Sequence, residues 1–143
     1  MGVFAAEVRP RWSDMDAFGH VNHANTVTLL EEARAELLFV EAARQGAQTM
    51  AGGMVVARLV VDYHLPLIAD GNSVRVEITV RTLKAASFTL DYTVHGGRSA
   101  GDAVVATAET LMVPYNLESG RPRRLAEAER DFLAGYRAGA GSA

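Results

Sequence analysis

One short segment, residues 11–25, is dense in side chains that can perform acid–base chemistry. It reads Arg-Trp-Ser-Asp-Met-Asp-Ala-Phe-Gly-His-Val-Asn-His-Ala-Asn and holds two carboxylates, two imidazoles and two carboxamides. A carboxylate can remove a proton from water or attack a carbonyl carbon itself, and an imidazole can orient either reactant. Loops that deliver such groups to the start of a helix are common sites of chemistry. An Asx-rich turn that only satisfies its own backbone has the same composition, so both readings stay open at this point.

Several other chemistries are not expected. The chain has no cysteine, which excludes disulfides, thiolate nucleophiles and cysteine-rich zinc sites. Its four histidines lack the spacing of a zinc site, so we expect no metal. We also expect no serine-nucleophile elbow, phosphate-binding loop or dinucleotide-binding fingerprint.

Composition narrows the class of protein further. The 143 residues suit one domain, and 49% apolar with 22% charged residues is ordinary for a globular protein. The formal net charge is −3, with thirteen Arg and one Lys, which argues against a nucleic-acid partner. No apolar run approaches the roughly 18 residues of a membrane span. The first residues carry no basic segment before an apolar one, so we expect a cytoplasmic protein.

The elements that must position the polar segment follow from hydrophobic spacing. Residues 4–12 have strand character that Pro10 limits to an edge or a strand end, and residues 13–22 read as a loop. Helical spacing then runs over about 24–45, with Asn22 or Asn25 as its cap and Gly46 at its end. Period-two alternation predicts strands over 55–65, 74–81, 88–95 and 103–115, and weak helical spacing covers 121–137.

This order is an α+β pattern, with one long helix that a strongly curved antiparallel sheet can wrap. No internal repeat or linker interrupts residues 1–143, which we read as a single domain. The glycine-rich tail, residues 138–143, is expected to be disordered.

The polar segment and later motifs together resemble a known family. The pieces are Arg11, Trp12, Asp14, Asp16, Gly19, His23-Ala24-Asn25 and Glu31-Glu32-Ala33-Arg34, then Val61-Asp62-Tyr63, Pro66, Gly71, Ser87-Phe88, Pro114-Tyr115 and Arg121-Pro122. In this order they resemble the signature of the 4-hydroxybenzoyl-CoA thioesterase-like family over about residues 5–133. The resemblance implies the hotdog fold, a curved antiparallel sheet around one central helix.

The resemblance also implies an activity, the hydrolysis of an acyl-CoA to a free acid and CoA without a metal or redox cofactor. It places catalysis on Asp16, as general base or nucleophile, and allows His23 to orient water or substrate. Asp14 would hold the turn. Backbone N–H groups near the helix start, or around Gly52-Gly53 of a partner chain, would stabilise the oxyanion.

Six further positions are expected to bind substrate: Asn22, Asn25, Thr26, Arg81, Lys84 and Ser87. Asn22 can equally be a helix cap. Thr26 stands where the family usually has an aromatic residue, so we expect a reshaped acyl pocket and disfavour an aromatic substrate. Basic residues near Arg81 and Lys84 often meet the CoA phosphates across a subunit boundary in the family, although a solvated turn explains them as well.

The remaining polar residues have simpler explanations. We expect Glu31 and Arg34 to form a solvated i, i+3 bridge, and His64 and His95 to lie on the surface.

Alternatives remain open for function and partners. An acyl-carrier-protein thioester can replace the acyl-CoA as substrate. The same fold supports an enoyl-thioester hydratase or dehydratase, and a non-catalytic acyl-CoA-binding module would bind without turnover. Because sheet edges need cover, we expect at least a homodimer, or a homotetramer.

Overall fold

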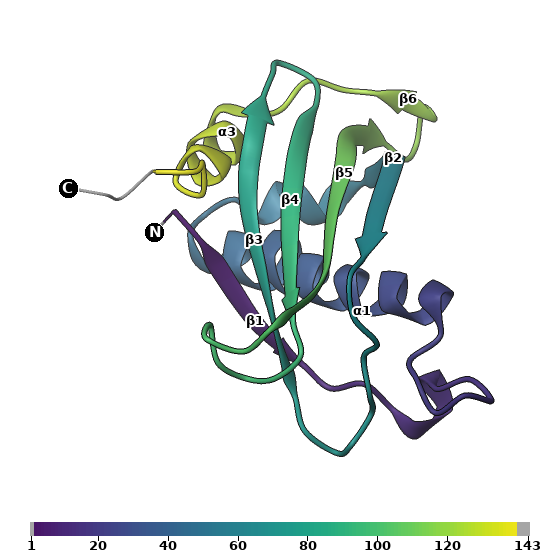
Figure 1. The fold of residues 1–143 in the computed structure, drawn as a ribbon. Coiled ribbons are helices and arrows are strands. Elements are labelled where there is room, and N and C mark those ends of the chain that lie inside the picture. The colour runs from purple at the N-terminus through teal and green to yellow at the C-terminus, as the bar shows by residue number, and fades with distance from the viewer. Residues whose placement is uncertain (1, 140–143) are drawn as a thin grey trace.

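A curved antiparallel sheet wraps around one long helix in this protein (Figure 1). The computed structural model describes residues 2–139. The strands are β1 (Phe4–Val8), β2 (Met54–Tyr63), β3 (Val74–Leu83), β4 (Phe88–His95), β5 (Val104–Asn116) and β6 (Arg121–Pro122). The first five lie in the order β1-β3-β4-β5-β2, and β6 pairs with β5. This is the hotdog arrangement that the resemblance implied.

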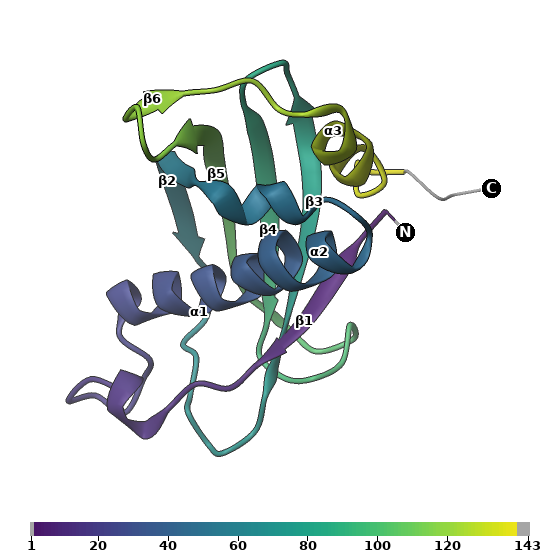
Figure 2. The ribbon, with the colours of Figure 1, turned by 180° about the vertical axis from the view of Figure 1, so that it is seen from behind.

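The long helix occupies the concave face of the sheet (Figure 2). It is continuous over residues 23–44 and consists of α1 (His23–Ala35), a π-helical turn (Glu36–Glu41) and α2 (Ala42–Arg44). It therefore begins and ends one residue earlier than its spacing predicted. Four leucines form its sheet-facing stripe and are at most 2% exposed: Leu29, Leu30, Leu37 and Leu38.

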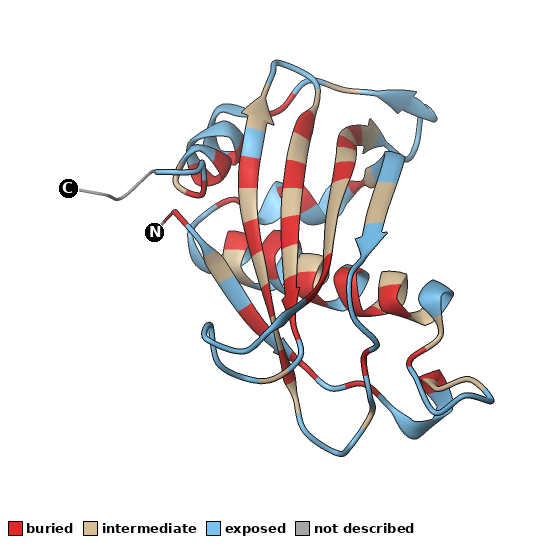
Figure 3. Cartoon of the chain, in the orientation of Figure 1, coloured by how far each residue is buried: buried red, intermediate tan, exposed pale blue. Residues whose placement is uncertain are grey.

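The central strands supply the other half of the core. Alternate residues of β3 and β4 are buried against the helix, and those between them are partly exposed on the outer face (Figure 3). The period-two prediction is confirmed here. β2 differs because it is an edge strand: in residues 2–139 it pairs only with β5. Its apolar side chains Val55, Val56, Leu59 and Tyr63 remain 37–49% exposed.

Several details of the predicted elements were wrong. β1 ends at Val8, before Pro10, and Trp12–Asp14 forms a 3-10 turn in place of a strand end. A bulge between Val56 and Arg58 interrupts the simple alternation expected along β2. The C-terminal helix α3 is shorter, Glu127–Ala134, because Arg121–Pro122 pairs with β5 and the Glu129 carboxylate caps the helix at Ala126 N. Of the predicted tail, residues 140–143 lie outside the described residues.

A close approach fixes the start of β2. Gly53 follows a 3-10 turn (Gln48–Gly52) and has a φ of +150°, a conformation that side chains rarely allow. A Cβ atom there would lie 2.6 Å from the carbonyl oxygen of Tyr115. The neighbouring Gly52 has no heavy atom within 4 Å of such a position.

Candidate active site

Asp14 holds together the loop that precedes α1. It is 4% exposed, and its carboxylate accepts hydrogen bonds from Arg11 N at 2.7 Å and Arg11 Nε at 3.2 Å. Its carbonyl oxygen accepts from Asn22 N at 2.8 Å and Asn25 Nδ2 at 3.1 Å. Burial alone would raise the pKa of Asp14, but the bonds from Arg11 hold that pKa below its ordinary value. The carboxylate therefore stays charged and ties the loop to the helix start.

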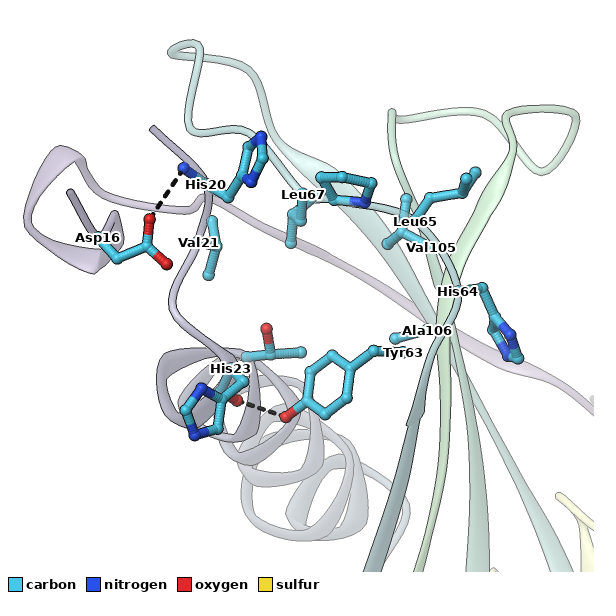
Figure 4. A pocket seen from close by; sticks show the side chains of 12 residues that line it. Asp16, His20, Val21, His23, Tyr63, His64, Leu65, Leu67, Val105 and Ala106 are labelled. Atoms are coloured by element: carbon cyan, nitrogen blue, oxygen red, sulfur yellow. Dashed lines mark hydrogen bonds between the residues drawn. The ribbon is translucent and has the colours of Figure 1, made fainter. Parts of the chain in front are cut away.

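Asp16 has a different environment in the same loop. Its Oδ1 accepts from Phe18 N at 2.9 Å and from His20 N at 3.4 Å, which is an Asx turn. Gly19 adopts a φ of +80° to complete the reversal. Oδ2 has no hydrogen-bond partner within residues 2–139, and Figure 4 shows it turned toward the helix start. One oxygen fixes the residue, and the other is available for chemistry.

The start of α1 presents one free backbone donor. Asn22 is the cap, since its Oδ1 accepts from Ala24 N at 2.9 Å. Its carbonyl oxygen accepts from Asn25 N at 2.9 Å and Thr26 N at 3.1 Å. Among the described residues, the N–H of His23 is the first-turn amide without a partner. The positive end of the helix dipole lies at the same place.

A cavity of about 350 Å³ adjoins this loop, the start of α1 and the adjacent ends of β2 and β5 (Figure 4). Its polar lining residues are Asp16, His20, His23, Thr26, Tyr63 and His64. Its apolar lining residues are Val21, Leu65, Pro66, Leu67, Val105 and Ala106. The structure thus brings Asp16, His23 and Thr26, three predicted site residues, to one cavity.

Tyr63 is a polar lining residue that was not predicted to belong to the site. Its hydroxyl donates to the carbonyl oxygen of His23 at 2.5 Å, and its ring meets the His23 ring edge to face, with centroids 6.4 Å apart. Burial raises the pKa of Tyr63. The motif Val61-Asp62-Tyr63 was visible, but only the pairing of β2 places this side chain on the helix side of the sheet.

Two of the predicted site residues have structural contacts of their own. The Asn22 side chain caps the helix, and the Asn25 side chain bonds to Asp14 O. Substrate contact by either carboxamide stays a prediction.

The predicted phosphate-binding residues lie at the other end of the sheet, on β3 and in its turn to β4. Arg81 donates from Nε to Asp91 at 2.9 Å and from Nη1 to Glu109 at 2.8 Å. The hydrogen bonds that Arg81 donates to the Asp91 carboxylate raise the pKa of Arg81. Lys84 N donates to Ser87 O at 2.9 Å in the turn, and the Lys84 side chain makes no ion pair within residues 2–139. Within one chain, none of these residues lines the Asp16 cavity.

The histidines outside the loop differ from each other. The His64 ring is turned away from the cavity, with Nε2 3.0 Å from Thr107 Oγ1 (Figure 4). His95, expected at the surface, is 5% exposed. Its Nδ1 lies 2.9 Å from Asp102 O and its Nε2 3.3 Å from Glu77 Oε1, because the turn after β4 covers it.

The expected bridge from Arg34 to Glu31 is not formed in the described structure. Arg34 is half-buried, and its Nη1 donates instead to the hydroxyl of Tyr92 at 3.2 Å. The same hydroxyl lies 2.8 Å from Thr110 Oγ1. The Arg34 guanidinium therefore bonds to the buried hydroxyl pair of Tyr92 and Thr110 and not to Glu31 on the helix surface.

Other chemistries find no support in the described structure. The letters of residues 97–101, Gly-Arg-Ser-Ala-Gly, match a serine elbow, but they form the turn from β4 to β5 with no helix after it. Ser99 Oγ accepts from Gly101 N there. Within residues 2–139 no three metal-ligating side chains cluster, and no helix is both long and apolar enough to cross a membrane.

Several solved structures are similar to this chain. Among solved structures, a thioesterase from Thermus thermophilus, complexed with coenzyme A and zinc, is 30% identical. The match covers 92% of each chain with a TM-score of 0.73. A predicted thioesterase from Bacillus stearothermophilus is 24% identical over 94% of this chain and 96% of that one, with a TM-score of 0.77, and shows the shared fold.

The PA5185 protein of Pseudomonas aeruginosa also shares the fold, at 22% identity over 96% of this chain and 93% of that one, with a TM-score of 0.79. A search of curated proteins gave no match. Residues 10–135 match the family model of the thioesterase-like superfamily, which is most of the chain. The chain therefore belongs to the thioesterase-like superfamily and is a thioester hydrolase.

Proposed function

We propose that the protein hydrolyses an acyl-CoA thioester to a free acid and CoA, with Asp16 as general base or nucleophile. The observation that carries this proposal is the state of the Asp16 carboxylate. One oxygen is fixed by the Asx turn, and the other has no partner in residues 2–139 and adjoins a cavity at a helix start. The Thermus thermophilus thioesterase, which is complexed with coenzyme A, supports CoA as the thiol part of the substrate.

The chemistry balances without a metal or redox cofactor. As general base, Asp16 takes a proton from a water molecule whose oxygen attacks the thioester carbon. The tetrahedral intermediate then collapses, the C–S bond breaks, and the CoA thiolate recovers the proton from Asp16. As nucleophile, the carboxylate instead displaces the thiolate to form a mixed anhydride, which water then hydrolyses.

The negative charge that develops on the thioester carbonyl oxygen needs a hydrogen-bond donor, and the helix start can provide one. The N–H of His23 is free in the described structure and lies at the positive end of α1. We assign it to the developing oxyanion. The His23 side chain is exposed beside the cavity and orients the water or the pantetheine arm. Thr26, which is 4% exposed, forms part of the cavity wall on the acyl side.

A second copy of the chain completes the site in this proposal. β2 has ten residues, or about 33 Å at 3.3 Å per residue, with the Asp16 cavity at its Tyr63 end and Gly53 at the other. Antiparallel pairing of two β2 edges about a two-fold axis places the partner's start of β2 beside Tyr63. The same pairing carries Lys84, Arg81 and Ser87 from the far end of the partner toward this cavity, where the CoA phosphates can reach them.

Thiol release tests the proposal directly. The protein is incubated with short, medium, long and aromatic acyl-CoAs, and free CoA is followed with a thiol reagent while the free acid is measured by mass spectrometry. We expect both products in equal amounts from at least one acyl-CoA. Hydration of an enoyl-CoA without thiol release would indicate the hydratase alternative. Binding of acyl-CoA without either product would indicate a non-catalytic module. Turnover of acyl-carrier-protein thioesters alone would mean that the acyl carrier protein, and not CoA, carries the acyl group of the substrate.

A further inference from the structure

Tyr63 connects the edge strand to the first residue of the long helix. It is the last residue of β2, and its side chain reaches from the sheet to the start of α1 (Figure 4). The hydroxyl donates to His23 O at 2.5 Å, and the two rings meet edge to face. These two residues are forty positions apart, so this contact is a tertiary link and not local turn geometry.

Tyr63 bonds to His23, the residue whose backbone N–H has no partner in residues 2–139. The carbonyl of His23 accepts the phenol, while the N–H of His23 has no partner in residues 2–139. The amide and carbonyl groups of one residue belong to two planar peptides joined at one Cα, so holding the carbonyl restricts where the amide can move. A donor at this position needs fixed geometry, since an oxyanion is stabilised only within about 2.7–3.1 Å of the N–H nitrogen.

We infer that Tyr63 is a positioning residue for thioester hydrolysis, which holds the His23 peptide so that its N–H stays in place for the oxyanion. This inference rests on the proposed function. Tyr63 acts through His23 and does not itself exchange a proton with the substrate. The ordinary pKa of a phenol is about 10, and burial raises the pKa of Tyr63 further, so the hydroxyl is protonated and able to donate at neutral pH.

A purely structural role would have different consequences. Tyr63 is 49% exposed at the edge of the sheet, so the residue as a whole is not part of the buried core. Loss of the Tyr63 hydroxyl should therefore leave the fold intact. It should disturb the position of the His23 N–H, which matters only when negative charge develops on the carbonyl oxygen of the substrate. Interactions that strengthen in the transition state change kcat and the binding of its analogues, whereas uniform packing effects change substrate binding as well.

Tyr63→Phe tests this distinction in the full chain. We expect kcat for a hydrolysed acyl-CoA to fall about 10-fold, less than the roughly 10²–10³ lost with an oxyanion donor itself, and KM to change by less than about two-fold. Two CoA analogues provide a second readout. A trifluoromethyl ketone, whose hydrate mimics the tetrahedral intermediate, should bind about 10-fold more weakly, and a non-hydrolysable thioether should bind as before.

A matched control comes from the other end of the helix. Tyr136→Phe also removes one phenol hydroxyl, which accepts from Gln45 Nε2 at 3.0 Å just after α2. It should leave kcat and both analogue affinities unchanged. If Tyr63→Phe loses structure, Tyr63 is replaced by 4-aminophenylalanine, which keeps a donor in the same place and should retain most of the wild-type kcat.

The outcomes separate this inference from the proposed function. Wild-type protein that releases no thiol from any acyl-CoA refutes the proposed function. Active wild type together with unchanged kcat in Tyr63→Phe refutes the positioning role alone. Equal weakening of the ketone and the thioether also overturns it, because that pattern marks a general distortion of the cavity.

Discussion

The carboxylates of Asp14 and Asp16 are two positions apart, yet one is enclosed and the other is open. Asp14 accepts three hydrogen bonds from Arg11 and is 4% exposed. Asp16 accepts only backbone N–H groups, and they use a single oxygen. The loop therefore separates a residue that maintains its shape from a residue that can react.

Asp16→Asn should abolish most turnover without unfolding the protein. The amide keeps the shape and the oxygen that accepts from Phe18 N, but it cannot remove a proton or form an anhydride. As loss of a general base it should reduce kcat by about 10²–10⁴-fold, with little change in KM. Stopped assays of thiol release, with circular dichroism as a fold control, measure this. An unchanged kcat would falsify the assignment.

A single turnover of wild-type protein in ¹⁸O water then separates the two roles of Asp16. Attack by the carboxylate makes an anhydride, and water that attacks the Asp16-derived carbonyl carbon of this anhydride places label in the Asp16 side chain. Attack by water places label only in the released acid. Mass spectrometry of the peptide that contains Asp16 gives the answer.

Changing Lys84 and Arg81 together to Ala should weaken acyl-CoA binding. Exposed ion pairs contribute little, so we expect KM to rise roughly two- to ten-fold while kcat stays near wild type. A pantetheine thioester without the nucleotide should be unaffected. Arg44→Ala, an exposed arginine at the end of the helix, is the control. Equal effects on both substrates would contradict phosphate binding by this pair.

The protein should be a homodimer or larger in solution. The free edge of β2 exposes Val55, Val56 and Leu59, and such an edge needs a partner strand. Leu59→Arg should shift the mass measured by light scattering toward the monomer and lower the specific activity. Val3→Arg, at an exposed apolar residue just before β1, should do neither. A wild-type monomer with full activity would rule out the shared site.

Acid should remove stability that Glu129 provides at neutral pH. Its fully buried carboxylate accepts from Arg123 Nη1 at 2.8 Å and Ala126 N at 2.7 Å. Burial raises the pKa of Glu129, but these bonds outweigh it and hold the pKa below its ordinary value. A depressed pKa gives stability that is complete above the ordinary carboxyl pKa and is lost as pH falls through the folded value.

Glu129→Gln should accordingly lower the free energy of unfolding by about 2 kcal/mol at neutral pH, as expected for hydrogen bonds to a charged group. The difference from wild type should shrink as the solution is acidified, which urea titrations at several pH values would show. Glu127→Gln, on the exposed side of the same helix, should show no such trend. A constant difference across the pH range would mean that the charge of Glu129 is not the stabilising feature.

Removal of metal should leave turnover unchanged. The proposed steps use only Asp16 and backbone groups, although the Thermus thermophilus thioesterase is complexed with zinc as well as coenzyme A. Overnight dialysis against EDTA, followed by the thiol-release assay, should change kcat by less than about two-fold, since no Lewis acid is assigned a step. Activity that falls and returns with added zinc would require a different mechanism.

Local patterns predicted the parts of the fold whose periodicity is undisturbed. The helix was placed to within one residue because Asn22 caps it and its leucines repeat with helical spacing. β3 and β4 followed from strict alternation. The bulge in β2 and the short strand β6 could not be predicted, since both depend on how β5 pairs with each of them.

The site was predictable where a short segment carries it. Asp16 and His23 lie in one short segment that leads into the helix, so their proximity to the helix start could be predicted from their positions in the sequence. Tyr63 joins them from forty positions away, through the face that β2 presents after its bulge. His95 was misjudged because burial by the turn that follows β4 has no signature in the alternation of β4 itself.

The two adjacent glycines before β2 should be under different evolutionary constraints. A side chain at position 53 would strike the backbone oxygen of Tyr115 and would also have to adopt a φ of +150°. At position 52 there is open space and an ordinary backbone. As sequences drift, glycine at 53 should persist wherever the junction of β2 and β5 is kept, while the codon for 52 changes freely, so an alignment that shows the reverse would contradict this geometry.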